Sequence, residues 1–193
     1  GTSTPGLTGK DFAVARYTEA GDLDSNFGNG GIVTTSISDL DDIAYDVAVF
    51  SVQNETRIVV VGSSQISKNP SDTQIAAVLY DDRGNLVRTF GNNGIFRQDI
   101  TSQDDAALGV AVAGSKIVMA GFSGRGSATR SNFAIIRVNE VGIIDPTFNG
   151  NGIVEEQITN QNDYAASIVI QSVNSSEKIL VAGTSDLIGS AGT

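Results

Sequence analysis

The sequence predicts an all-β protein built from repeated four-stranded antiparallel sheets, and three observations support this prediction. An aromatic residue followed by a Gly/Asn turn and then by strand-forming residues occurs three times, at Phe27, Phe90 and Phe148. Each copy is surrounded by short runs of Val, Ile and Ala, and clusters of Gly, Asn, Asp and Ser separate these runs, as in strands joined by turns. No segment shows a helical period over three turns.

Each repeat contributes four kinds of strand-like run. In the first copy, one run begins at Phe12 and a second begins at Ile32, directly after the aromatic turn. A small apolar run over 44–50 follows, and a β-branched run that ends in Gly62 completes the set. The small apolar runs recur at 107–113 and 165–170, and the glycine-ended runs recur at 117–121 and 179–183.

Four antiparallel strands that recur about every sixty residues are typical of β-propeller blades. The innermost strand of a blade is packed on both faces, so we assign the small apolar runs to it. The glycine-ended runs become the second strands, the runs like that at Phe12 the third, and those like that at Ile32 the outermost. This assignment gives complete blades over about 43–100 and 106–159, with half-blades at either end.

The whole chain, 1–193, is therefore predicted to be one β-propeller or a propeller segment, with repeats at approximately 11–72, 73–132 and 133–193. Three repeats are too few to close a ring, since propellers have about four to eight blades. An unclosed array leaves blade faces and strand edges exposed. We therefore expect completion by further repeats of a longer parent protein or by a second copy of the chain, as a homodimer.

Composition excludes several classes of function. The net charge of −10 argues against nucleic-acid partners and anionic membrane surfaces, and no apolar run is long enough for membrane insertion. The chain has no Cys and no His, which removes disulfides, thiolate chemistry, Ser-His-Asp triads and imidazole-bound zinc. We expect no enzyme activity and no cofactor; a hydrolase with a carboxylate pair and an oxygen-bound metal is the remaining catalytic alternative.

The repeated motifs resemble the delta-60 repeat of bacterial surface and secreted proteins. The first copy carries the resemblance at Arg16-Tyr17, Gly21, Leu23-Asp24, Phe27-Gly28 and Gly31, and the later copies carry Asp105, Lys116-Ile117 and Lys178-Ile179. The second copy departs from the pattern, with Leu79 in place of Arg16. The resemblance implies a β-propeller, export and a large modular protein, and it brings no established activity.

An Asp-Asp pair precedes each of the first two predicted inner strands and Asn162-Asp163 precedes the third, and these pairs are the first candidate ligand site. Asp42, Asp105 and Asp163 would surround one mouth of a central channel, where they could hold a cation or a basic peptide. The structural alternative is that each carboxylate accepts backbone hydrogen bonds that tie one blade to the next. This alternative is favoured because the motif recurs in every unit.

Two further sets of residues are candidates. The loops at 63–72, 122–132 and 184–193 differ most between repeats and carry Arg125 and Arg130, so they are candidates for ligand binding. Asp22, Asp24 and Asn26 have the alternating oxygen spacing of a calcium loop, without its closing Glu. Turn formation by these Asx side chains is the alternative to calcium.

The predicted function is a non-enzymatic, exported binding or adhesion scaffold on the bacterial surface or outside the cell. Its ligand would lie on the loop-rich face. Protein or peptide ligands are preferred to glycans, because Trp is absent and aromatic residues make up 6% of the chain. The alternative is a purely structural role as spacer repeats of a large bacterial surface protein.

Overall fold

The structure, a computed structural model, describes residues 9–70, 72–125, 130–174 and 176–186, and within these ranges it contains strands, turns and loops but no helix. The predicted all-β class is confirmed. The strands are β1 (Phe12–Ala15), β2 (Ile32–Thr35), β3 (Asp42–Val52), β4 (Glu55–Gln65), β5 (Thr73–Asp81), β6 (Ile95–Gln98), β7 (Asp105–Ala113), β8 (Lys116–Arg125), β9 (Arg130–Val138), β10 (Ile153–Glu156), β11 (Asp163–Val173) and β12 (Ser176–Ser185).

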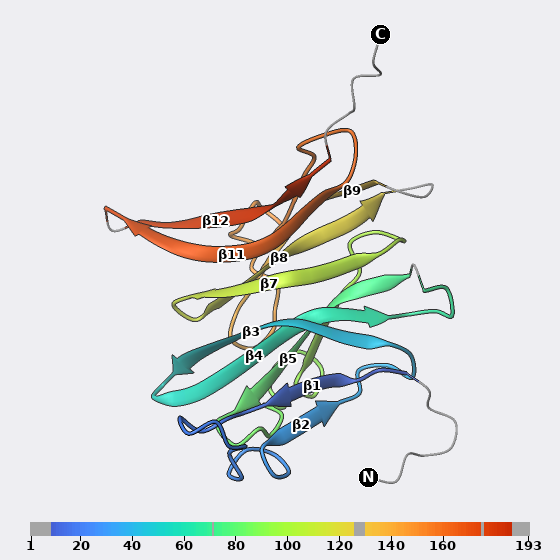
Figure 1. Ribbon diagram of the computed structural model, residues 1–193. Helices are drawn as coiled ribbons and strands as arrows, with labels where there is room; N and C mark the ends of the chain where they lie inside the picture. The colour runs from blue at the N-terminus through green and yellow to red at the C-terminus, as the bar shows by residue number, and fades with distance from the viewer. Residues whose placement is uncertain (1–8, 71, 126–129, 175, 187–193) are drawn as a thin grey trace.

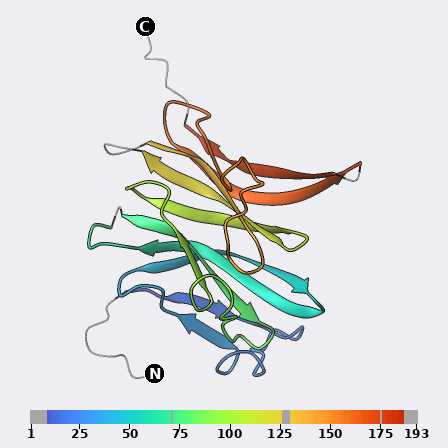
Figure 2. The same ribbon diagram turned by 180° about the vertical axis from the view of Figure 1, so that it is seen from behind.

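The strands form four antiparallel sheets that are stacked in chain order (Figures 1 and 2). The two middle sheets have four strands each, in the orders β3-β4-β5-β6 and β7-β8-β9-β10. Two-stranded sheets lie at the ends of the stack, β1-β2 at one end and β11-β12 at the other. The predicted strand order, the two complete units and the half-units are thus confirmed, and no sheet within the described residues closes on itself.

The two end sheets correspond to opposite halves of a middle sheet. β1 pairs with β2 through Phe12 opposite Thr35, just as β5 pairs with β6 through Ile75 opposite Gln98. β11 and β12 share with β3 and β4 a β-bulge three residues into the first strand, between Ala165 and Ser167. The β1-β2 sheet is therefore an outer half, and the β11-β12 sheet is an inner half.

Apolar side chains between neighbouring sheets form the core. The largest cluster joins Val59 and Leu79 of the first middle sheet to Val110 and Met119 of the second. A second cluster packs Phe12 and Phe27 against the first middle sheet, and a third packs the second middle sheet against Ile168. The faces of the sheets, rather than their edges, therefore hold the stack together, which is the mode in which stacked repeats gain stability.

The predicted burial of the inner strands on both faces holds for β7 but not for β3, nor for β11, where Val169 is 55% exposed. Val110 of β7 is 6% exposed, whereas Val47 and Val49 of β3 are 52% and 66% exposed. The reason is that the sheet before β3 contains β1 and β2 only, so no inner strands cover this face. The alternating apolar side chains of β3 therefore lie on a face that no inner strand covers among the described residues.

The repeated aromatic turns connect each sheet to the next. In all three turns, a glycine N–H donates to the aromatic carbonyl, with Gly31 N to Phe27 O at 2.8 Å as the first example. Gly28 N donates to Arg83 O of the next sheet at 2.8 Å, and Gly91 N donates to Val141 O at 2.9 Å. Gly28 and Gly91 have φ of 55° and 52°, a conformation that favours glycine.

Two of the variable loops are shorter than predicted. β4 continues to Gln65 because Ser63 and Ser64 pair with strands on both sides although they are polar. β8 continues to Arg125 because residues 123–125 pair with β9. Connections of 66–72 and 126–129 remain, and residues 126–129 lie outside the described ranges. Most of the third predicted loop, at 187–193, also lies outside them.

Candidate functional site

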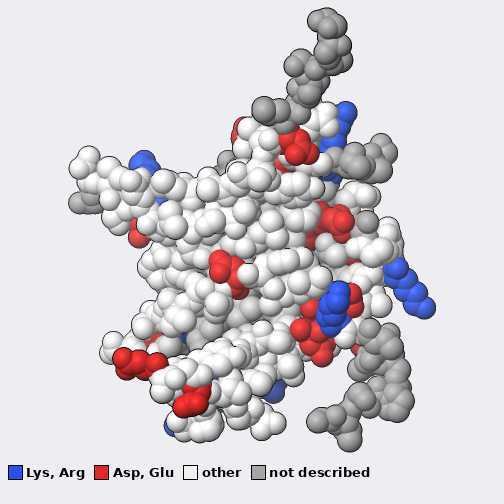
Figure 3. All heavy atoms as spheres, viewed as in Figure 1, with Lys and Arg blue, Asp and Glu red and all other residues white. Residues whose placement is uncertain are grey.

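The connections that enter the inner strands lie together at one end of the strands, on the side of the molecule that we call the loop end. These are residues 36–41, 99–104 and 157–162, together with the 66–72 connection between β4 and β5. The opposite end, the turn end, carries the three aromatic turns. In Figure 3 the loop end lies to the right, and acidic side chains gather there with basic ones among them.

Asp42, Asp105 and Asp163 begin β3, β7 and β11 at the loop end, and all three are buried. Each accepts two backbone N–H groups and one hydroxyl from the connection just before it. The backbone distances are 2.7 and 2.9 Å from Ile37 and Ser38 to Asp42, 2.6 and 2.9 Å from Ile100 and Thr101 to Asp105, and 2.9 and 3.0 Å from Ile158 and Thr159 to Asp163. The hydroxyls of Ser38, Thr101 and Thr159 each lie 3.0 Å from the same aspartate.

These contacts are the ones expected from the structural alternative. A carboxylate that accepts three hydrogen bonds from its own connection fixes the path from the outer strand of one sheet to the inner strand of the next. The predicted role of these carboxylates in binding stays a prediction. Their position gives the loop end a frame that is the same in every repeat.

The environment of these aspartates differs along the stack. Burial raises the pKa of Asp105 to about 6, although hydrogen bonds from Thr101 and Ile100 oppose this shift. Burial also disfavours the charged form of Asp163, but hydrogen bonds from the Ser185 hydroxyl and from Thr159 lower its pKa overall. Asp105 lies within a complete sheet between two neighbours, whereas Asp163 lies in the half-sheet at the end of the stack.

The residues before these aspartates make separate contacts rather than one cluster. Asp41 forms an ion pair with Lys10 at 3.2 Å, and the Lys10 N–H lowers its pKa. Burial raises the pKa of Asp104, which accepts a hydrogen bond from the Thr73 hydroxyl at 3.2 Å. Within the described ranges, no three His, Cys, Asp or Glu residues are grouped closely enough to hold a metal ion.

Arg125 and Arg130 lie in strands rather than in a loop, which corrects their predicted placement. They are opposite each other at the ends of β8 and β9, on either side of the 126–129 connection. With the amide oxygen of Asn132 facing Arg125, that oxygen accepts hydrogen bonds from Nε at 2.8 Å and from Nη2 at 3.0 Å. Arg130 is exposed at the loop end, so the structure leaves it accessible to a ligand.

The Asp22–Asn26 segment lies at the turn end, away from these residues. Asp24 accepts the Arg16 Nε–H at 2.9 Å and the Asn26 N–H at 3.0 Å, and its pKa is lowered by the Asn26 N–H first and by Arg16. This is the turn geometry of the alternative to calcium. Nothing in the arrangement of Asp22, Asp24 and Asn26 adds support for the predicted metal.

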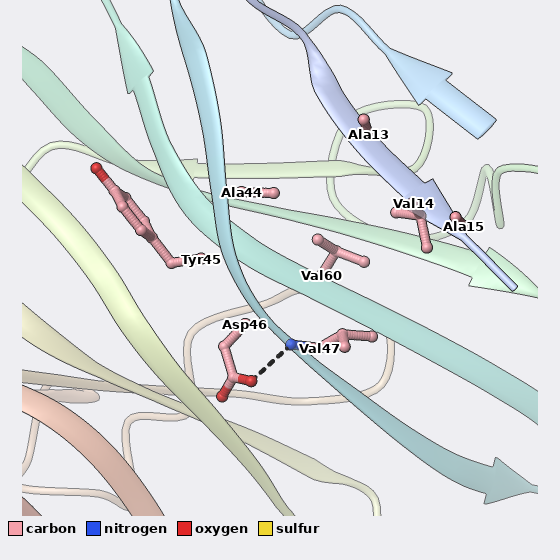
Figure 4. A pocket seen from close by; sticks show the side chains of 8 residues that line it. All are labelled: Ala13, Val14, Ala15, Ala44, Tyr45, Asp46, Val47 and Val60. Atoms are coloured by element: carbon pink, nitrogen blue, oxygen red, sulfur yellow. Dashed lines mark hydrogen bonds between the residues drawn. The ribbon is translucent and has the colours of Figure 1, made fainter. Parts of the chain in front are cut away.

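A hollow of about 240 Å³ lies between β1 and β3, on the uncovered face of the first middle sheet. Ala13, Val14 and Ala15 line one side, and residues 44–47 with Val60 line the other (Figure 4). Most of the lining residues are apolar, but the exposed surface is about as polar as it is apolar, and Asp46 is the charged residue among them. The hollow is continuous with the free edge of β1, where β1 has a partner only in β2 among the described strands.

Sequence reasoning missed the role of Asp46. Its carboxylate accepts the Val110 N–H at 2.8 Å, which connects β3 to β7 of the next sheet. A charged residue inside a run of small apolar residues needs a partner, so the sequence could have predicted that Asp46 makes a specific contact. The sequence did not show that the partner would be a backbone group 64 residues away.

Comparison of the chain with known protein families, with characterised proteins and with solved structures finds no match. The described residues include no helix that is long and apolar enough to cross a membrane. The function is therefore argued from the sheets, the loop end and the free faces described above.

Proposed function

We propose that this chain is a non-enzymatic, exported binding or adhesion scaffold, in which the stacked sheets are blades of a β-propeller and the ligand lies at the loop end. One observation carries the proposal. The same aspartate contact fixes the entry to every inner strand, while the connections beside it differ between repeats. A constant frame with unlike loops is how rigid folds present binding sites.

The propeller arrangement is supported by the contacts between sheets. Each sheet packs its face on the next, and β7 contacts β3 on one side and β11 on the other. The sheets are thus related by repetition of one interface, which is the relation between neighbouring blades of a propeller. Export, to the bacterial surface or outside the cell, follows from the resemblance of the motifs and remains part of the proposal.

A protein or peptide ligand fits the loop end better than a glycan. Tyr17 and Tyr45 are exposed, but Tyr17 belongs to the turn end and Tyr45 to the face of β3. At the loop end, the Phe122 and Tyr164 rings pack edge to face at 5.0 Å between centroids and join two sheets. The described loop end therefore presents charge and backbone rather than free aromatic rings for sugars.

Selection of displayed random peptides and a glycan array, both with the 193-residue chain, would test the proposal. Lys68 of the 66–72 connection and Arg130 are both exposed at the loop end. We expect specific peptides to be retained, and we expect the variant Lys68→Ala/Arg130→Ala to weaken their binding by at least about tenfold, the loss of about 1.4 kcal/mol. Arg83→Ala/Arg88→Ala is the matched control, because it removes the same charge from exposed positions between β5 and β6 at the turn end. Its binding should equal that of the wild type.

Two outcomes would contradict the proposal. Retention of neither peptides nor glycans would favour the spacer alternative, in which the repeats only separate other parts of a surface protein. Equal loss of binding in both double variants would show that the ligand responds to net charge and has no site at the loop end.

A further inference from the structure

We propose that a second copy of this chain completes the two half-sheets, with β12 of one copy paired to β1 of the other at both ends, so that two copies close head to tail. The strand pairing rests on the sheets alone. The closed ring of six sheets rests in addition on the propeller arrangement proposed above.

The two half-sheets are complementary and cannot join within one copy. The β11-β12 sheet is an inner half and the β1-β2 sheet is an outer half, so together they contain the strands of one middle sheet. They lie at opposite ends of the stack (Figures 1 and 2). A second copy can therefore supply what each end lacks.

The middle sheets define the register of the missing pairing. Gly62 of β4 is opposite Ala76 of β5, and Gly121 of β8 is opposite Ala134 of β9. The corresponding residues at the ends of the stack are Gly183 of β12 and Ala13 of β1. Within the described residues, β12 pairs only with β11 and β1 only with β2, so both edges have unpaired backbone groups.

Apolar side chains on the two end sheets are exposed where their counterparts are buried. Val110 and Ile168 are 6% and 7% exposed because each packs on the preceding sheet, whereas the corresponding Val47 is 52% exposed. Leu180 is 44% exposed, although the corresponding Val59 and Val118 are fully buried. The proposed pairing places Leu180 of one copy over Val47 of the other, at the hollow in Figure 4.

Charges at the two ends of the stack are also complementary. Arg16 donates a hydrogen bond to the Asp82 carbonyl of the next sheet, and its guanidinium lies 3.3 Å from the Asp82 carboxylate. In the second middle sheet, Arg137 of β9 occupies the position that Arg16 has in the β1-β2 sheet. In the β1-β2 sheet, Glu19 occupies the position that Asp82 has in the first middle sheet. The second copy thus brings an exposed acidic residue, Glu19, to Arg137.

The link between aromatic turns gives the same result. Gly28 N and Gly91 N each donate to a carbonyl in the turn of the next sheet, and the next donor in the series is Asn149 N. Gly84 and Gly142 lie close to the aromatic turn of the preceding sheet. A Cβ added at Gly84 would lie 3.2 Å from the Gly28 nitrogen, and one added at Gly142 would lie 2.6 Å from the Gly91 nitrogen. An added Cβ at the corresponding Gly21 would meet nothing within 4 Å. The turn of Gly21 is therefore free to receive Asn149 of the second copy.

Two copies are the number that closes. Each copy contributes two complete sheets and two halves, so two copies give six sheets, within the range of about four to eight blades in propellers. A head-to-tail interface closes when its rotation allows a ring, and otherwise it produces an open filament. Each interface in the closed dimer contains one complete composite sheet.

The mass in solution tests this assembly directly. We expect twice the chain mass of 20.0 kDa by light scattering. Val47→Asp and Leu180→Asp should each yield single chains with an unchanged far-ultraviolet circular dichroism spectrum, since both side chains are already half exposed within one copy. Ile66→Asp is the matched control, because Ile66 is 43% exposed but lies at the loop end of a middle sheet, and it should remain a dimer.

Mixing the two variants separates head-to-tail pairing from other dimers. One interface of the mixed dimer joins the unchanged Leu180 of the first variant to the unchanged Val47 of the second, so dimers should reappear. If β12 paired with β12 instead, Val47→Asp alone would stay a dimer. That result would overturn the proposal, and so would a wild-type chain that is single, as expected if repeats of a longer chain are the natural occupant.

A disulfide cross-link tests the register, because the chain has no Cys. Val14→Cys with Ala182→Cys should form an intermolecular disulfide on mild oxidation, since Ala77 opposite Val61 and Ile135 opposite Ala120 are the corresponding pairs. Val14→Cys with Val181→Cys, one residue out of register, should not. A disulfide within one chain would overturn the pairing, and a ladder of larger assemblies would overturn the closed ring.

A single chain that still retained loop-end peptides would contradict this assembly without affecting the proposed function.

Discussion

At the scale of single residues, the aspartate at the start of each inner strand shows how one side chain can serve two neighbouring sheets. Its carboxylate accepts two backbone N–H groups that have no strand partner, and a nearby hydroxyl adds a third hydrogen bond. Buried N–H groups without a partner cost about 1–3 kcal/mol each, so this contact stabilises the partly buried part of the connection. The same contact occurs at Asp42, Asp105 and Asp163.

The pH dependence of stability should reveal the burial of Asp105. Its pKa is raised from 3.8 to about 6, so the unfolded chain loses this proton at a lower pH than the folded chain. The stabilising contribution is complete below about pH 4 and is lost as the pH rises through about 6, at about 1.4 kcal/mol for each unit of pKa difference. Urea unfolding at pH 4 and pH 7 should show that the advantage of the wild type over Asp105→Asn shrinks at the higher pH.

Asp163→Asn is the control for this measurement, because the pKa of Asp163 is lowered rather than raised. The contribution of Asp163 is present above its unfolded pKa and is lost as the pH falls, so the advantage of the wild type over this variant should not shrink between pH 4 and pH 7. The same trend in both variants would show that Asp105 is not distinguished by its burial.

Arg16 and Asp24 form a pair that the second repeat replaces as a unit. The backbone contact is the same in both, with Asp24 N to Arg16 O and Val87 N to Leu79 O at 2.9 Å. The charged pair and the apolar pair are thus alternative solutions for one position. We expect Arg16→Leu/Asp24→Val to unfold at a higher urea concentration than Arg16→Leu, because Arg16→Leu leaves the Asp24 carboxylate without its ion pair, whereas in Asp24→Val Arg16 keeps its contact with Asp82. Additive effects in this double-mutant cycle would contradict the coupling.

At the scale of elements, the turns decide how closely the sheets stack. Gly142 and Gly21 occupy corresponding turns with φ of 74° and 89°, but only Gly142 lies against a neighbouring turn. Gly21→Ala should therefore cost about 1–2 kcal/mol, the price of a left-handed conformation. Gly142→Ala should cost more than about 3 kcal/mol, because its Cβ would also displace the backbone of Gly91.

Urea unfolding of both glycine variants would measure this difference. The Val47→Asp background keeps assembly from contributing to the result, since Gly21 lies where we place the second copy. Similar losses for the two variants would show that the turn conformation alone matters and that the sheets do not interlock through their turns.

At the scale of the whole molecule, repetition of one interface explains both the stability and the open ends of the stack. The second middle sheet buries both faces, the first leaves the β3 part of one face uncovered, and each end sheet buries one face. The exposed apolar side chains of β3, β11 and β12 are therefore a consequence of position in the stack rather than of their local sequence. Corresponding residues such as Val47, Val110 and Ile168 are alike in chemistry and differ in exposure because of their neighbours.

The sequence by itself determined the strands, their order within a sheet, the complete units and the half-units. These features depend on alternation, β-branched residues and turn residues over a few positions, which local physical chemistry decides. It also identified Asp42, Asp105 and Asp163 as special, with both of their possible roles.

Only the tertiary structure decided which of those contacts exist and which faces stay uncovered. The three aspartates accept hydrogen bonds from their own connections, Arg125 ends β8, and Arg130 begins β9. Asp46 contacts β7 because two sheets from different repeats meet there. The Asp46 contact joins residues that lie 64 positions apart in the chain, so no local pattern encodes the geometry between them. The exposure of Val47 and Leu180 follows from that geometry, because burial depends on the neighbouring sheet rather than on the residue.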